Sequence, residues 1–61
     1  MKFNEAVDMI RNYAVNELGV QNSSLPEVIE AIQDNFEDVR DDAEVVVAYR
    51  VVMRDISALL G

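Results

Sequence analysis

Carboxylates are the side chains of this sequence that could do chemistry, and six of them fall in one helical stripe near its middle. Their spacings of three, four and one residues keep them on one side of an α-helix, opposite an apolar side. This stripe, the acidic ridge, consists of Glu27, Glu30, Asp34, Glu37, Asp38 and Asp41. The opposite seam consists of Leu25, Val28, Ile29, Ile32, Phe36 and Val39. The pattern predicts a dense anionic surface backed by a hydrophobic core.

The chemistry of these carboxylates is not catalytic. Paired carboxylates act as general acid and base where they converge in a cleft that separates their pKa values, whereas these line a convex face. The sequence has no His and no Cys, and Lys2 is its one lysine, so no serine has a base to activate it. We therefore predict that the protein is not an enzyme, has no catalytic residues and needs no cofactor.

The acidic run from Asp34 to Glu44 also raises the alternative of a calcium site, since Ca²⁺ prefers oxygen ligands. An EF-hand loop alternates its ligands around a central Gly, and this run contains no Gly. No metal site is predicted.

Two interpretations of the acidic ridge remain. Charge runs are usually the solvated face of an amphipathic helix. The functional interpretation is mimicry of nucleic acid phosphates: at 1.5 Å per residue the ridge would span roughly 21 Å, with charges roughly 5 Å apart. Arg40 is the one cation in the stripe, whereas a surface that serves only solubility mixes both signs. The ridge is thus the predicted binding surface for a basic protein partner.

Size and composition indicate one small domain that needs a partner. The 61 residues carry a net charge of −7, and 51% are hydrophobic, which is enough for a folded core. A chain of this length buries only about 60% of its unfolded surface, and small folds usually add a disulfide, a metal or a partner chain. Without Cys or His, a partner chain, identical or different, is the remaining option, and we predict a homodimer because of the third helix described below. The negative charge repels nucleic acids and anionic membranes, and neither is a predicted partner.

The N-terminal ten residues do not form a signal peptide, because Glu5 and Asp8 interrupt the apolar residues. No stretch reaches the roughly 18 apolar residues of a membrane span. We therefore expect a cytoplasmic, intracellular protein, in the host cytoplasm if a phage encodes it.

The elements that position the ridge are predicted to be helices, in an all-α three-helix bundle spanning residues 1–61. The apolar period predicts a first helix over 3–18, with Asn4 as N-cap and Gly19 as the stop. A polar connection leads to Ser24, which with Glu27 forms a capping box that starts a second helix over 25–38.

The end of the second helix has two interpretations. Asp41 followed by Glu44 indicates a new N-cap and a break near 38–41. The apolar period nevertheless continues without Gly or Pro, which would suit one long helix. We predict the break, with a third helix over 42–60 and Gly61 as its stop.

The third helix is apolar on two sides, so two short helices cannot cover it completely. This favours self-association through its second apolar face, formed by Val47, Ala48, Val51 and Ala58. The valine-rich start of this segment is also prone to form a strand, but its length and spacing favour a helix.

The stretch from Ser24-Leu25 through the acids to Phe36-Glu37-Asp38 resembles the recognition helix of an acyl carrier protein, over about a quarter of the chain. That resemblance implies that Ser24 carries the prosthetic group. The sequence departs from the family pattern with Ser23 in place of Asp before the serine and with Pro26 inside the motif.

Our leading functional prediction is a small acidic inhibitor or regulator that places its ridge in the nucleic-acid-binding groove of a basic partner, such as a nuclease or a toxin. In size and charge it resembles, as a type, the anti-defence inhibitors of phages and mobile elements. The alternatives are an antitoxin that uses the same ridge and a homo-oligomeric structural or assembly protein that uses the apolar face of the third helix.

Overall fold

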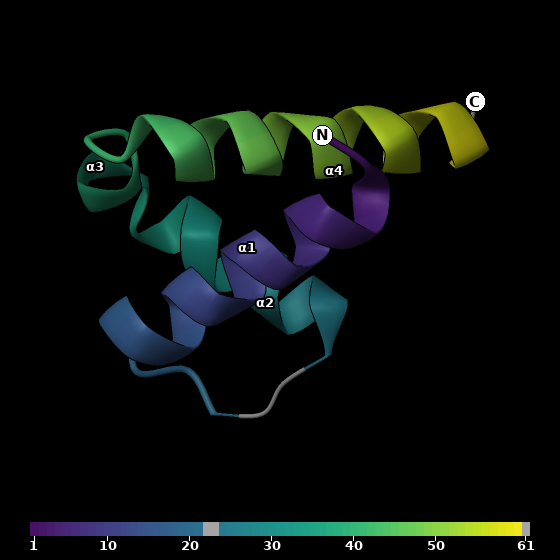
Figure 1. The fold of residues 1–61 in the computed structure, drawn as a ribbon. Coiled ribbons are helices and arrows are strands. Elements are labelled where there is room, and N and C mark those ends of the chain that lie inside the picture. Colours follow the sequence, from purple (N-terminus) through teal and green to yellow (C-terminus); the bar gives the residue numbers. More distant parts are fainter. Residues whose placement is uncertain (22–23, 61) are drawn as a thin grey trace.

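Helices form nearly all of the described chain. The computed structural model describes residues 1–21 and 24–60, so the predicted Gly61 stop and most of the predicted connection before Ser24 lie outside the described residues. The elements are α1 (Phe3–Glu17), α2 (Leu25–Asp34), α3 (Phe36–Val39) and α4 (Ala43–Leu60) (Figure 1). No strand occurs within these described ranges, so the all-α prediction is confirmed and the strand alternative for the valine-rich segment is wrong.

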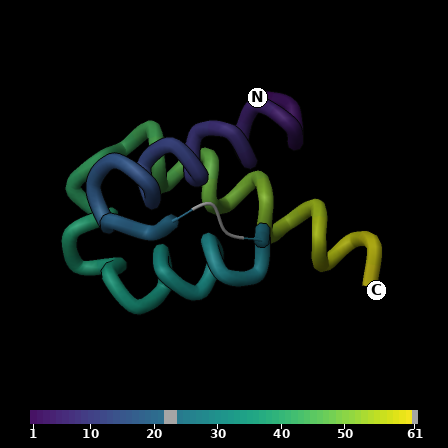
Figure 2. Tube along the Cα trace, turned by 90° about the horizontal axis from the view of Figure 1, so that it is seen from below, coloured from purple at the N-terminus to yellow at the C-terminus, as the bar shows by residue number. Residues whose placement is uncertain are grey.

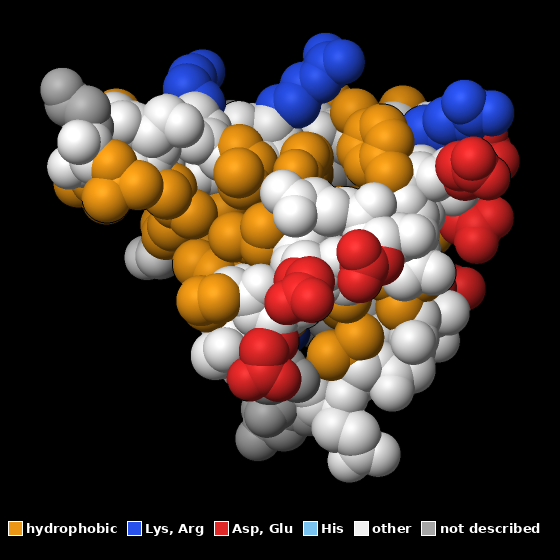
Figure 3. Space-filling model, turned by 180° about the vertical axis from the view of Figure 1, so that it is seen from behind, with side chains coloured by type: hydrophobic (Ala, Val, Ile, Leu, Met, Phe, Trp, Pro, Cys, Tyr) orange, Lys and Arg blue, Asp and Glu red, His pale blue; other side chains and the backbone are white. Residues whose placement is uncertain are grey.

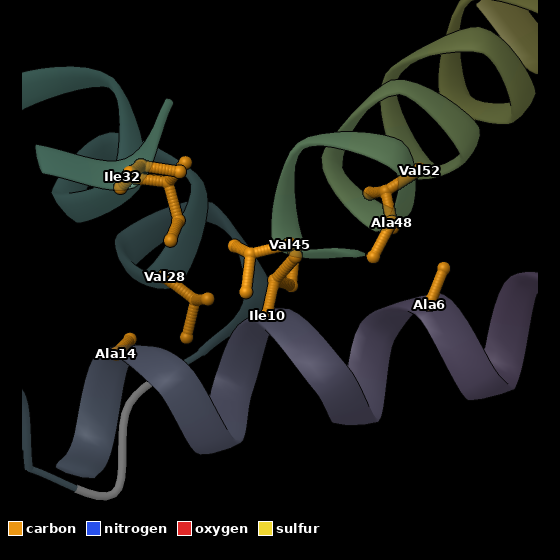
Figure 4. Packing of buried hydrophobic residues seen from close by; sticks show 9 residues of the cluster. Ala6, Ile10, Ala14, Val28, Ile32, Val45, Ala48 and Val52 are labelled. Carbon is orange, nitrogen blue, oxygen red and sulfur yellow. The ribbon is translucent and has the colours of Figure 1, made fainter. Parts of the chain in front are cut away.

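The helix α1 lies at the centre of the packing and contacts both α2 and α4. Its buried side chains, Ala6, Ile10 and Ala14, recur every four residues and form a single stripe. Figure 4 shows that this stripe faces two ways: Ala6 points toward Val52 of α4, and Ala14 toward Val28 of α2. The short alanine side chains let the helices approach closely, while Ile10 fills the space between them.

The predicted positions of two helix ends are confirmed, whereas the Ser24–Glu27 capping box and the Asn4 cap are wrong. Gly19 follows the end of α1 with φ 69°, the left-handed conformation that glycine adopts without strain. Ser24 immediately precedes α2, as predicted, but its hydroxyl donates to the Glu27 carboxylate at 3.1 Å instead of capping an amide. Asn4 is not the N-cap of α1, because the helix already begins at Phe3.

The chain between α2 and α4 bends twice. Residues 40–42 separate α3 from α4, which confirms the predicted break near 38–41. A second break at Asn35 was not predicted. The Asn35 side-chain amide donates to the carbonyl of Ala31 at 2.9 Å, a local bond that competes with continuation of the helix.

The second break changes the role of Phe36. In one continuous helix, Phe36 would follow Val28 and Ile32 into the core at steps of four. In the structure Val39 of α3 is fully buried instead, and Phe36 is 38% exposed. Its ring lies 5.9 Å from that of Tyr49, whose hydroxyl accepts a hydrogen bond from Gln33.

The side chain that caps α4 is that of Asp42. Its Oδ1 accepts the backbone N–H of Val45 at 3.3 Å, as an N-cap residue does. The predicted cap, Asp41, lies one residue too early. The two acids are adjacent in sequence, and only the backbone path after α3 selects between them.

We expect Asp42→Ala to lower the free energy of unfolding by about 1 kcal/mol, since the Val45 amide loses its partner. Asp42→Asn is the matched control, because it removes the same charge but keeps a capping oxygen. Urea denaturation followed by circular dichroism would measure both variants. Equal stability of the Ala and Asn variants would contradict the cap.

Candidate functional site

The acidic ridge lies on the surface, but the chain divides it into two parts. All six carboxylate residues are exposed. Those at 27, 30 and 34 lie on α2, those at 37 and 38 lie on α3, and Asp41 lies in the following turn. Figure 3 shows acidic side chains in a row across this face that continues to the edge where α3 lies. The ridge is therefore bent at Asn35, and the straight rod expected from one helix is not formed.

The ridge carboxylates have no ion-pair partners in the part of the chain that the structure describes. The ion pair found there is Arg54–Asp55 at 3.5 Å, on α4. Within the ridge, Glu27 accepts the hydrogen bond from the Ser24 hydroxyl, which leaves its charge in place. Arg40, the one cation of the stripe, is exposed and makes no ion pair with a described residue. The negative charge of the ridge is thus not neutralised by direct contacts.

The charges of acidic residues from α1, α3 and the turn before α4 act together on the hydroxyl of Tyr13. Partial burial, followed by the charges of Asp38, Glu17, Asp42 and Asp41, raises the pKa of the Tyr13 hydroxyl above its ordinary value. These carboxylates are therefore close enough to act on one phenol. Glu17 belongs to α1, and no signal in the sequence connects it with α3.

Charge is distributed unevenly between α4 and the rest of the chain. Residues 1–42 hold ten of the twelve acidic residues and three of the five basic ones, so they carry the entire net charge of −7. The helix α4 is neutral, with Glu44 and Asp55 balanced by Arg50 and Arg54. On the face seen in Figure 3, basic side chains project along the α4 edge, and those nearest the α3 end lie beside acidic side chains.

The predicted oligomer surface is only partly available. Ala48 is fully buried in the core of the single chain, so its assignment to an interface is wrong. Val47 is 49% exposed, Val51 is half-buried and Ala58 is exposed. The reason is that α1 packs on the side of α4 that contains Ala48, whose small side chain permits close contact.

The most exposed large hydrophobic side chains of the described residues lie at the C-terminal end of α4. Their exposure was not predicted from the sequence. Leu59 and Leu60 are each 85% exposed. Beside them is an open hollow of about 360 Å³, lined by Phe3, Asp55, Ala58 and Leu59. Phe3 comes from the start of α1, so only the packing of α1 on α4 forms this hollow.

Neither a metal centre nor a membrane span is found in the described ranges. No three His, Cys, Asp or Glu side chains among residues 1–21 and 24–60 are grouped so that they could hold a metal ion. Each described helix is too short or too polar to cross a bilayer. Ser24, which the carrier-protein resemblance singled out, is an exposed residue at the start of α2.

Comparisons with protein-family models, curated proteins and solved structures find no match to this chain. Its function is therefore inferred from its own surface.

Proposed function

We propose that this protein is a small non-enzymatic inhibitor or regulator that binds a basic protein through the acidic ridge. The observation that supports this proposal is the exposure of six neighbouring carboxylates without an ion-pair partner among the described residues. Such a surface has an electrostatic potential that attracts cationic clefts and accelerates encounter with them.

The preferred partner is a protein whose basic groove normally holds nucleic acid, such as a nuclease or a toxin. Lysine and arginine side chains that neutralise phosphates can equally pair with carboxylates. Occupation of the groove by the ridge would exclude the nucleic acid, and no catalytic group is required for this effect.

Phe36 is a partly exposed aromatic side chain in the segment that carries the ridge. It lies between Asp34 and Glu37 in sequence and is 38% exposed. The contact of its ring with Tyr49, itself hydrogen-bonded to Gln33, limits its motion. Because aromatic residues are enriched at the centres of protein interfaces, we assign Phe36 to the partner contact.

Anti-defence inhibitors of phages and mobile elements and antitoxins of basic toxins both fit this mechanism. The second candidate is a homo-oligomeric structural or assembly protein, and the observation that favours it is the exposure of Leu59 and Leu60. In that case the acids serve only to keep the assembly soluble.

Capture on the immobilised chain, followed by elution with double-stranded DNA, tests the ridge mechanism. The captured protein should be basic, should be released by DNA, and should bind more weakly as ionic strength rises, since salt screens charge pairs. Retention in the presence of both DNA and moderate salt would contradict the proposal and favour the assembly protein.

A further inference from the structure

We propose that the C-terminal end of α4 is a homodimer interface. In this dimer, Leu59 and Leu60 of one copy contact the hollow beside Phe3 in the second copy. The proposed interface contains none of the six ridge residues. It also differs from the interface predicted from sequence, which included the buried Ala48.

Uncovered apolar side chains gather at the C-terminal end of α4. In Figure 2 the last turns of α4 extend beyond the body formed by the other helices. Both leucines in these turns are 85% exposed. Figure 3 shows hydrophobic side chains gathered along this end of α4 and on the neighbouring surface. Contiguous apolar surface of this kind marks an interaction site.

The end of α4 is complementary in shape to a second copy of itself. A two-fold dimer uses the same patch on both copies, so one patch must offer both a projection and a recess. The end of α4 offers both: the leucines project, and the hollow lined by Phe3, Asp55, Ala58 and Leu59 lies beside them. Leu59 contributes to both parts, so the two halves of the patch adjoin each other.

The charge distribution favours a second copy as the occupant of this end. Two copies with a net charge of −7 repel each other wherever their acidic segments meet. The helix α4 is neutral, so an approach through its end brings no net charge of this helix against the same helix of a second copy. A basic partner, by contrast, is attracted to the ridge and gains no charge pairing from this neutral end.

Sedimentation equilibrium over a range of protein concentrations tests the proposal. We expect the natural chain to form dimers, and Leu59→Glu to raise the dimer dissociation constant by about tenfold or more, as for a residue at the centre of an interface. Val47→Glu is the matched control. It adds the same charge at an exposed position of the same helix, outside the hollow, and should leave the dimer unchanged.

Ionic strength distinguishes this contact from binding by the ridge. Salt screens the repulsion between two acidic copies, so the dimer should strengthen in the same range in which ridge binding weakens. Circular dichroism of Leu59→Glu should match the natural chain, because the altered side chain is outside the core.

A cysteine variant tests independently whether the C-terminal ends of α4 from two copies lie close together. The chain contains no Cys, so Leu60→Cys introduces a single thiol. Mild oxidation should convert it to a disulfide-linked dimer, whereas Val47→Cys should remain largely unlinked. A chain that is monomeric at all concentrations, or a dimer lost in Val47→Glu but kept in Leu59→Glu, would overturn the proposal. Binding of a monomer to uncharged phospholipid vesicles through Leu59 would also overturn it, by assigning this end to a lipid surface.

Discussion

Neutralising three carboxylates of the acidic ridge, with Glu30→Gln, Asp34→Asn and Glu37→Gln, is expected to weaken partner binding strongly while the chain stays folded. These side chains are exposed and make no ion pair among the described residues, so their neutralisation does not disturb the core. If each charged pair with the partner contributes about 1 kcal/mol, the triple variant binds about a hundredfold more weakly, or weaker still. Titration calorimetry with the captured partner measures the change.

The chain offers a closely matched control for this variant. Glu5→Gln, Asp8→Asn and Glu44→Gln remove the same three charges, with the same residue types, from exposed positions on α1 and α4. We expect this control to retain most of the affinity, because local pairing outweighs the long-range effect of net charge at moderate salt. Equal decreases in affinity for both triple variants would show that only the total charge matters, and the ridge would then be an ordinary solvated surface.

The largest expected effect on stability is that of Ile10→Ala, which should eliminate most of the cooperative unfolding transition. Ile10 is fully buried on the central helix, within the cluster that joins α1 to α2 and α4. Truncation of a buried isoleucine to alanine costs about 2–5 kcal/mol. A domain of this length has about 3–9 kcal/mol in total, so the loss approaches the whole stability.

Thermal denaturation followed by circular dichroism would show this loss as a lower and broader transition. Val15→Ala is the control, since it shortens a side chain of the same helix that is 44% exposed. Its effect should be within about 0.5 kcal/mol. A sharp, unshifted transition in Ile10→Ala would mean that α1 is not the helix that holds the domain together.

Local signals in the sequence were enough to place most helix ends. Ser24 and Pro26 mark the start of α2, and Gly19 marks the end of α1. Each signal acts through hydrogen bonds or dihedral angles within about one turn of the chain, so no knowledge of the rest of the fold is needed. The exposure of the ridge followed from the same local periodicity, since the apolar seam opposite it had to be buried.

The sequence pattern predicted the wrong helix boundary where two neighbouring positions were nearly equally suitable. Asp41 and Asp42 are both good N-caps, and the one used depends on how the chain leaves α3. Asn35 is compatible with both a helix interior and a helix end. In the structure it ends α2, and Val39 of the following helix is fully buried. These differences are small in free energy, so tertiary contacts decide them.

The amino-acid sequence by itself determined that the chain is helical, that it carries its net charge outside α4, and that its carboxylates face outward. Only the tertiary structure decided which apolar side of α4 meets α1, that Phe36 is partly exposed, and that Phe3 joins Leu59 in one hollow. The physical reason is the range of the interactions. Periodicity fixes the angles between side chains on one helix, but the orientation of that helix is set by packing against segments distant in sequence.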